Sequence, residues 1–371
     1  MPSELSAGSA GEELAAWIRL THVSGVGGES QRRLLQSFES PEAIFAASRS
    51  ALTAVIGATL AERLIHEDCN DAIAATRLWL QESGNHVVTL ADADYPRALL
   101  TSVDPPVLLY AKGRRNLLNA PAFAIVGSRN ATKQGEANAQ AFAAALASAG
   151  LVIVSGLALG IDAAAHRGAL GATGATIAII GTGADRIYPA RNADLARAIA
   201  ETGLIISEFA LGTPPLAANF PRRNRLIAGL ARGCLVVEAA DQSGSLITAR
   251  LAADAGCDVF AIPGSIHSPL SRGCHKLIRQ GAKLVESAQD ILEELKWDAV
   301  TTPATSQSAA QEAPPGADDT ILAAIGADPC DLDTLAERTG LSAEALLPRL
   351  LPLELDGRIA RLPGGRYQRL H

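Results

Sequence analysis

Residues 152–169 read VIVSGLALGIDAAAHRGA, and this stretch decides the fold that the sequence predicts. Its β-branched start, residues 152–154, is typical of a buried parallel strand. Ser155 and Gly156 end the strand, and an Ala-rich helix follows from Ile161. A strand, a turn of small residues and a helix N-terminus together form an anion site, because the free amides of the first helical turn point at the ligand. The same glycines could instead serve only close packing of the helix on the sheet.

Strands and helices alternate on both sides of this stretch. Helices are predicted between most of the strands, including one at residues 192–201 with Asn192 as its N-cap. Alternation of this length requires a parallel sheet covered on both faces, so the predicted fold class is α/β with an extended Rossmann-like parallel-sheet core. Ligands of such sheets bind at the carboxyl ends of the strands. The predicted strands are residues 87–90, 107–110, 123–126, 151–154, 176–181, 204–207, 234–238, 258–262 and 283–285.

Helical patterns flank this core. Before it, residues 12–80 predict an all-α module, SAM-like or helix-hairpin-helix-like, with a glycine-rich turn at residues 24–28. Such turns can bind a DNA backbone through their amides, but an ordinary helix–helix turn is favoured here because the module is acidic. After the core, three short helices and a hairpin predict a winged helix. The predicted domains are residues 1–84, 85–297 and 318–371, with a flexible Ser-, Thr- and Pro-rich linker at 298–317.

Composition favours a cytoplasmic protein with a large apolar core. The chain has 371 residues, of which 48% are hydrophobic, and no apolar run approaches the ~18 residues of a membrane span. We expect neither a signal peptide nor a membrane contact, because the N-terminus is polar and acidic. The five cysteines are scattered and form no CxxC pair, which fits a reducing compartment.

The net charge of −7 is unevenly distributed. Residues 1–119 carry −4 and residues 297–371 carry −5, whereas residues 120–296 have 16 basic and 14 acidic side chains. The predicted sheet region is therefore the only positive part of an acidic chain, and a polyanionic partner is not excluded there.

Polar residues and cations follow four of the predicted strands. These ends converge along one edge of a doubly wound sheet, and their amides, hydroxyls and cations suit a row of phosphates better than a single one. The residues are Gly127, Ser128, Arg129 and Lys133 after the first strand, Ser155 and Gly156 after the second, Arg191 and Asn192 after the third, and Ser243, Gly244, Ser245 and Thr248 after the fourth.

An arginine-rich helix start forms a fifth element. Arg222, Arg223 and Arg225 open an apolar helix, although each cation at a helix N-terminus costs a few tenths to ~1 kcal/mol. Two interpretations are open. The arginines pair with Glu208 or Glu238, or they bind an anionic ligand. In the second case Phe220 and Tyr188 could stack bases, as binders of single strands require.

Taken together, the motifs at these strand ends resemble those of the DNA-processing protein A (DprA/Smf) family. The motifs GSRNATKQG at 127–135, VSGLALGIDAAAHRGAL at 154–170, ISEFALGTPPLAANFPRRNRLIAGL at 206–230 and VVEAADQSGSLITARLAADAG at 236–256 carry the resemblance. It extends collinearly over residues 107–291, and both flanking modules are common in that family. The resemblance implies single-stranded DNA binding on the Rossmann-like core, a homodimer, and help in loading RecA recombinase onto incoming DNA in natural transformation.

The resemblance also implies which residues contact DNA. Many relatives have Lys after the Tyr-Pro pair where this chain has Ala190, so Arg191 is the candidate to supply that charge. The implied contacts are Ser128, Arg129, Ser155, Gly156, Arg191, Asn192, Phe220, Arg222, Arg223, Asn224, Arg225, Ser243, Gly244, Ser245 and Thr248.

The alternative is a Rossmann-like nucleotide-binding enzyme of the phosphoribohydrolase, lysine-decarboxylase-like type. That group uses a PGGxGTxxE turn with a catalytic Glu, but this chain has Thr248 at the comparable position and no PGG before it. Asp162 and His166 share a helix face, which capping and packing explain better than catalysis. No GxGxxG is formed, and His267, Cys274 and His275 lack metal-ligand spacing. We therefore predict no catalysis, no cofactor and no metal.

The sequence thus predicts sequence-independent binding of single-stranded DNA with a steep dependence on ionic strength. The dimer interface is expected within residues 270–291, by analogy with the family. The recognition-helix candidate of the winged helix, residues 342–355, is Leu-rich with one Arg and two Glu, which favours a protein-contact or auxiliary role over binding of duplex DNA.

Overall fold

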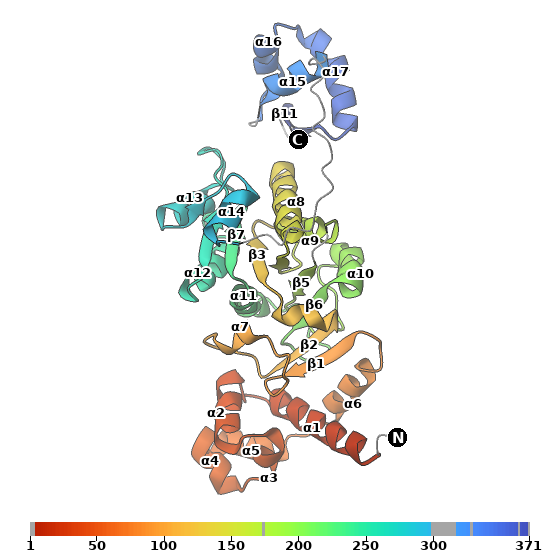
Figure 1. Ribbon diagram of the computed structural model, residues 1–371, viewed down its shortest axis with the longest axis vertical. Coiled ribbons are helices and arrows are strands. Elements are labelled where there is room, and N and C mark those ends of the chain that lie inside the picture. The colour runs from red at the N-terminus through yellow and green to blue at the C-terminus, as the bar shows by residue number, and fades with distance from the viewer. Residues whose placement is uncertain (1–3, 173–174, 298–316, 327–328, 363, 370–371) are drawn as a thin grey trace.

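The computed structural model describes residues 4–172, 175–297, 317–326, 329–362 and 364–369. Within these residues, nine strands form one mixed sheet in the order β1-β2-β6-β5-β4-β3-β7-β8-β9 (Figure 1). Neighbouring strands from β6 through to β9 are parallel, which confirms the predicted α/β core. The bounds are β1 Asn85–Thr89, β2 Leu108–Gly113, β3 Ala122–Val126, β4 Val152–Ser155, β5 Thr176–Ile179, β6 Leu204–Ser207, β7 Gly233–Val236, β8 Asp258–Ala261 and β9 Lys283–Leu284.

The sheet is not parallel throughout. Strand β1 pairs with β2, and β2 with β6, in antiparallel register. These two strands precede the α/β alternation in the sequence, so no crossover helix forces them to run parallel. They extend the sheet at the edge nearest the N-terminal helices.

Helices cover both faces of the sheet because buried strand residues alternate in direction. Phe123 and Ile125 face α8 Lys133–Ser148, α9 Ile161–Leu170 and α14 Ala288–Glu294, and α10 Ala193–Thr202 covers β5 and β6 on the same face. Ala124 and Val126 face α11 Asn219–Leu230, α12 Ser245–Asp254 and α13 Arg272–Arg279. Gly168 lets α9 lie directly against the backbone of α8 at Gln140, because a Cβ there would overlap the Gln140 carbonyl. Gly168 of the stretch 152–169 therefore serves close packing of helices, which was one of the two roles predicted for the glycines of this stretch.

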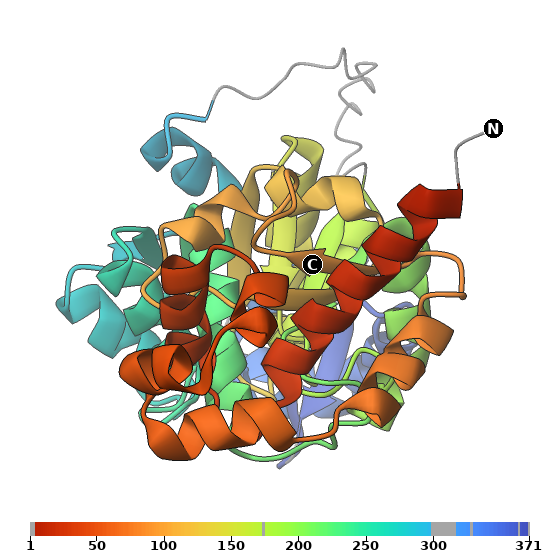
Figure 2. The ribbon, with the colours of Figure 1, turned by 90° about the horizontal axis from the view of Figure 1, so that it is seen from below.

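The N-terminal module, residues 4–79, is all-helical as predicted. Trp17 and Ile18 of α1 and Trp79 of α6 pack against β2, where the rings of Trp79 and Tyr110 meet edge to face at 5.8 Å. Figure 2 shows the module end-on, with its helices covering this end of the core. Its helices are α1 Glu4–His22, α2 Gly28–Phe38, α3 Pro41–Ala46, α4 Arg49–Ile56, α5 Ala58–His66 and α6 Asn70–Trp79.

The C-terminal residues form a winged helix with its own apolar core. Three helices are followed by the hairpin of β10 Ile359–Leu362 and β11 Arg366–Arg369. The helices are α15 Ala317–Ile325, α16 Leu332–Thr339 and α17 Ala343–Leu355. The predicted linker at 298–317 lies outside the described residues except for its last position, and the domain boundaries remain predictions.

The remaining elements are short, and one predicted cap is wrong. They are α7 Arg97–Leu100, the 3-10 turn η1 Arg115–Asn119 and the 3-10 turn η2 Ala190–Asn192. Asn192 does precede α10, but its side chain does not cap that helix. It donates instead to the carbonyls of Leu157 and Ala158, at 2.9 and 3.2 Å, because the loop after β4 lies beside it. In the part of the chain that is described, no helix is both long enough and apolar enough to span a membrane.

Candidate nucleic-acid interface

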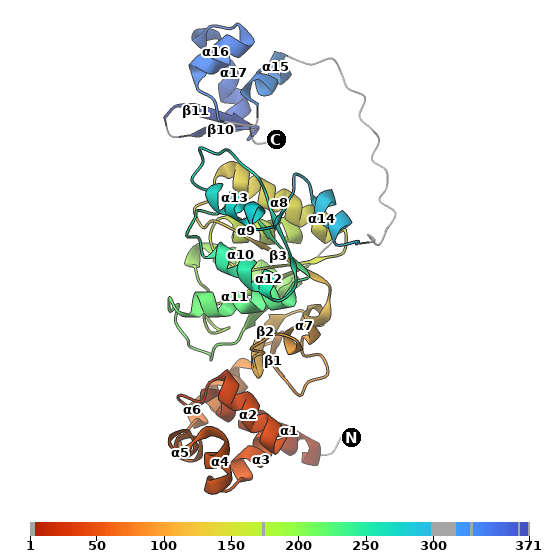
Figure 3. The ribbon, with the colours of Figure 1, turned by 90° about the vertical axis from the view of Figure 1, so that its left-hand side faces the viewer.

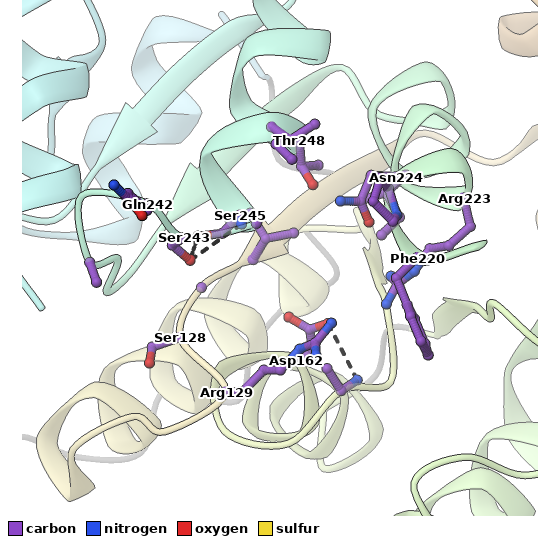
Figure 4. Close-up of a pocket in the computed structure, with 18 of the residues that line it drawn as sticks. Ser128, Arg129, Asp162, Phe220, Arg223, Asn224, Gln242, Ser243, Ser245 and Thr248 are labelled. Atoms are coloured by element: carbon purple, nitrogen blue, oxygen red, sulfur yellow. Dashed lines mark hydrogen bonds between the residues drawn. The ribbon is translucent and has the colours of Figure 1, made fainter. Parts of the chain in front are cut away.

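A cavity of about 720 Å³ opens at the carboxyl ends of the parallel strands β3, β4 and β7 (Figure 4). The strand order reverses between β3 and β7, which is where doubly wound sheets bind ligands. Side chains converge on it from the loops after these strands and from α11. The predicted contact residues that line it are Gly127, Ser128, Arg129, Phe220, Arg223, Asn224, Ser243, Gly244, Ser245 and Thr248.

The turn after β3 is fixed by the end of β7. The Ser128 amide donates to the Glu238 carbonyl at 2.7 Å, and the Ser128 hydroxyl accepts from the Asn130 amide at 3.1 Å. The Glu238 carboxylate accepts from the amide and hydroxyl of Thr132, the N-cap of α8, at 2.9 and 2.6 Å. Glu238 is thus occupied by the first turn of α8 and is not the arginine partner that the sequence suggested.

Arg223 is the cation buried in the wall of the cavity. Its side chain lies in the lining, it is 4% exposed, and one Nη donates to the Gly156 carbonyl at 2.9 Å. Its Nε has no hydrogen-bond partner among the described residues. Burial lowers the pKa of Arg223 to about 10, an effect that Asp162 opposes, so the guanidinium is still charged at neutral pH. A buried charged donor without an acceptor is costly, and an anionic ligand would supply one.

Asp162 is a lining residue that the sequence analysis assigned to capping and helix packing. Its carboxylate accepts from the amides of Gly156 and Ala158, at 3.1 and 3.4 Å, and so holds the loop between β4 and α9. Burial raises its pKa, and the nearby Arg223 opposes the rise. The signal in the sequence was an acidic residue in the first helical turn after Gly160, which local capping explains equally well.

Two aromatic rings form a platform at the rim. Tyr188 and Phe220 lie 5.7 Å apart between ring centroids at an interplanar angle of 41°. The Arg129 guanidinium lies 5.4 Å above the Phe220 ring. The exposed Tyr188 ring and the half-buried Phe220 ring beside a cation suit a stacked base next to its phosphate.

The fourth strand end supplies hydroxyls to the cavity. Its backbone amides are occupied within the turn itself, since the Ser243 hydroxyl accepts from the Ser245 amide at 3.3 Å and the Leu246 amide donates to the Ser243 carbonyl at 3.1 Å. The Ser243 and Ser245 hydroxyls are 2.7 Å apart, and Thr248 lies one turn further on. Gln242, also in the lining, was not singled out from the sequence.

Several predicted contact residues do not line this cavity. Gly156 lines a small adjoining cavity together with Arg129 and Phe220. Ser155 is fully buried and donates to the Ile125 carbonyl at 2.6 Å, and Asn192 is 2% exposed, so neither side chain is available to a ligand. Lys133 pairs with Glu136 on the surface of α8, and Arg191 is exposed on η2, outside the lining.

The three arginines of α11 have different surroundings. Arg222 and Arg225 both pair with the buried Glu208 carboxylate, and Arg225 also contacts Asp104 at 3.2 Å. The predicted pairing with Glu208 therefore holds for Arg222 and Arg225. Arg223 alone of the three faces the cavity, and its binding of an anionic ligand stays a prediction.

His166 has a structural place below the cavity. It is fully buried, and its Nδ1 lies 2.6 Å from the Thr176 hydroxyl, which itself donates to the Ile153 carbonyl. Nδ1 must therefore donate to that hydroxyl. Burial lowers the pKa of His166 to about 3, so the imidazole is neutral at physiological pH.

This burial predicts a pH-dependent loss of stability. The unfolded chain binds a proton at His166 near the ordinary pKa of 6.5, whereas the folded chain does not until about 3. The free energy of unfolding should therefore fall as the pH falls through 6.5, by about 2 kcal/mol between pH 7 and pH 5 from this residue alone. Urea unfolding of wild type and His166→Gln at pH 7 and pH 5 measures this effect. The free energy of unfolding should decrease less in the variant than in wild type. Equal decreases, or an NMR titration of His166 near pH 6.5, would contradict the assignment.

The cavity lacks a general acid–base pair within the described residues. Asp162 is the carboxylate of the lining, and two backbone amides occupy it. In the described part of the chain, no group of three or more His, Cys, Asp and Glu side chains could hold a metal ion.

Three family models match the chain. DNA recombination-mediator protein A matches residues 86–296, the DprA winged helix domain matches 303–365, and the SAM-like helix-hairpin-helix tandem matches 18–67. The chain is similar to Protein Smf of Escherichia coli K12, with 40% identity over 367 residues that cover 95% of each chain.

Two solved structures of similar proteins match the fold of this chain. The X-ray structure of DNA processing protein A from Streptococcus pneumoniae aligns with a TM-score of 0.68 and 41% identity, covering 75% of this chain and 97% of that one. A structure of DNA processing protein A from Helicobacter pylori, described with a single-stranded DNA binding mode, aligns with a TM-score of 0.52 and 34% identity, covering 57% of this chain and 96% of that one.

Proposed function

The chain belongs to the DNA recombination-mediator protein A (DprA/Smf) family, and from this membership we propose that it binds single-stranded DNA without sequence preference. The observation that carries the proposal is the buried Arg223 guanidinium, whose Nε lacks a partner, in the wall of a cavity with an aromatic platform at its rim. Phosphates would sit on Arg223, Arg129 and the hydroxyls of Ser243 and Ser245, and a base would stack on Phe220 or Tyr188. Every base has a π-face, so this recognition tolerates any sequence.

The proposal extends to DNA processing and recombination. We infer that the bound strand is protected and passed to RecA recombinase during transformation, and that two copies form a dimer through residues 270–291. Leu284 within that segment is an exposed apolar side chain that such an interface would cover. These steps involve binding and transfer, and we propose no catalysis.

The winged helix is proposed as a protein-contact or auxiliary module. On α17 the side chains of Leu347, Leu351 and Leu355 are exposed at four-residue spacing and form an apolar stripe along one helix face. A helix that reads duplex DNA usually carries cations on its exposed face, to neutralise phosphates.

Fluorescence anisotropy of a labelled oligo-dT tests the proposal. Phe220→Ala should weaken binding about 5- to 150-fold, because one stacked base contributes about 1–3 kcal/mol. Leu216→Ala, an exposed apolar residue of the preceding loop that is not in the cavity lining, is the matched control and should bind like wild type. For wild type, log K should fall by about 0.7 per neutralised phosphate for each tenfold rise in salt.

The same measurement separates the alternative function. Folded wild-type protein that fails to bind oligo-dT at low salt would refute the DNA proposal. A nucleoside monophosphate that binds in its place, with release of the free base, would favour the phosphoribohydrolase alternative.

A further inference from the structure

A chain of charged side chains joins the N-terminal module to helix α11. Arg32 of α2 contacts one oxygen of Asp104 at 2.6 Å and donates to the Pro105 carbonyl at 2.9 Å. The other oxygen of Asp104 lies 3.2 Å from Nε of Arg225, which in turn pairs with Glu208. Asp104 thus bridges the module and the helix that lines the cavity. In Figures 1 and 3, α2 lies at the end of the module nearest to β1, β2 and α7.

The two arginines and Glu208 of this bridge are largely buried, and the Asp104 side chain between them is 42% exposed. The side chains of Arg32 and Arg225 are 19% and 18% exposed, and that of Glu208 is 3% exposed. Charges in such surroundings are screened less than surface pairs, so removing one of them disturbs the others more. Arg49 of the same module differs from Arg32, since its side chain, which pairs with Glu62, is 67% exposed.

The glycine-rich turn before α2 is occupied by carboxylates of the chain itself. Glu67 accepts from the amide and hydroxyl of Ser24, at 3.0 and 2.8 Å. A Cβ built on Gly28, the first residue of α2, would lie 3.2 Å from the Asp104 carboxylate. The helix end that could have received a DNA phosphate therefore faces an acidic residue of the core, which indicates an internal role for this turn.

Arg225 lies two residues after Arg223 and five after Phe220, which α11 presents to the cavity. Phe220 and Arg223 precede it on the same helix, so whatever holds Arg225 also limits rotation of the helix about its axis. We propose that Asp104, held by Arg32 and in turn holding Arg225, is a positioning residue through which the N-terminal module sets the orientation of α11. The module thereby raises the affinity for single-stranded DNA without contacting the strand, an inference that rests on the proposed function of the cavity.

Full-length Arg32→Ala and Arg49→Ala form a matched pair of variants for the test. Oligo-dT binding by Arg32→Ala should be about three- to tenfold weaker than by wild type, whereas Arg49→Ala should bind like wild type. The dependence of log K on log salt should keep the wild-type slope in both variants, because neither arginine contacts a phosphate. A slope lower by about 0.7 in Arg32→Ala would mean a direct DNA contact and would overturn the inference.

Hydrogen exchange and a conservative variant separate positioning from general stability. Amides of α11 should exchange faster in Arg32→Ala, with those of α12 unchanged, and Arg32→Lys should recover most of the affinity. Arg32→Ala combined with Asp104→Ala should bind no more weakly than Asp104→Ala alone. If wild-type protein does not bind oligo-dT, the proposed function itself is refuted. If wild-type protein binds and Arg32→Ala has the same affinity and the same exchange rates in α11, only the proposed coupling between the module and α11 is refuted.

Discussion

Replacing Arg223 by Met should weaken binding of single-stranded DNA about 100-fold, the largest effect expected of any single side chain in the cavity. Its guanidinium is buried, and its Nε has no hydrogen-bond partner among the described residues, so the phosphate that we propose there would be its main acceptor. The same change should lower the free energy of unfolding by about 2–4 kcal/mol, because the buried Asp162 carboxylate loses its nearest cation. Anisotropy with oligo-dT and urea unfolding measure the two effects.

A second substitution separates these effects. Asp162→Asn added to Arg223→Met removes the isolated carboxylate, and an asparagine oxygen can still accept from the amides of Gly156 and Ala158. The double variant should regain most of the stability and none of the affinity. A folded Arg223→Met protein that binds oligo-dT like wild type would show that the cavity does not hold a phosphate.

Gly156→Ala should weaken binding about tenfold or more by displacing the same guanidinium, whose contact with a bound phosphate is a charge-assisted hydrogen bond. A Cβ at this position would overlap the end of the Arg223 side chain. Because the obstacle is the mobile end of a long side chain and not backbone, the chain should still fold, at a cost of about 1–3 kcal/mol. Anisotropy and thermal unfolding of the variant test this.

Gly171→Ala is the matched control for this change. Gly171 follows α9 outside the cavity lining, and the nearest atom to a Cβ there would be the Arg167 carbonyl oxygen at 3.4 Å, an ordinary contact. It should bind like wild type. Gly156→Ala combined with Arg223→Met should bind no more weakly than Arg223→Met alone, since both act through one guanidinium. Additive losses would instead place a DNA contact on the loop itself.

The order of strands and helices could be predicted because hydrophobic period and turn residues are local properties. The predicted helix after Ile161 appears as α9, and the predicted winged helix appears as three helices and a hairpin. The polar strand ends were also recognisable, since parallel strands bring their carboxyl ends to one edge. The antiparallel pairing of β1 and β2 was not predicted, because the partner of an edge strand is chosen by long-range packing, here against Trp17 and Trp79.

Residue types at strand ends did not reveal which side chains remain available. The hydroxyl of Ser155 and the amide of Asn192 suit a phosphate as well as those of Ser128 or Asn224. In the folded chain they bind carbonyls of Ile125, Leu157 and Ala158 that lie more than 25 residues away in sequence. Conversely, Asp162 looked like a capping residue, and only the loop after β4 places it in the cavity wall.

The sequence by itself determined the family, the α/β architecture and the edge of the sheet where a ligand would bind, because motifs, periodicity and chain order encode them locally. Only the tertiary structure decided which arginine of α11 faces that edge. Arg222 and Arg225 lie only about 60° apart around a helix, whereas Arg223 lies about 100° and 160° from them, so which side faces the cavity depends on how the helix is rotated when it packs. Glu208 and Asp104 fix that rotation by binding Arg225, and this leaves Arg223 in the cavity wall.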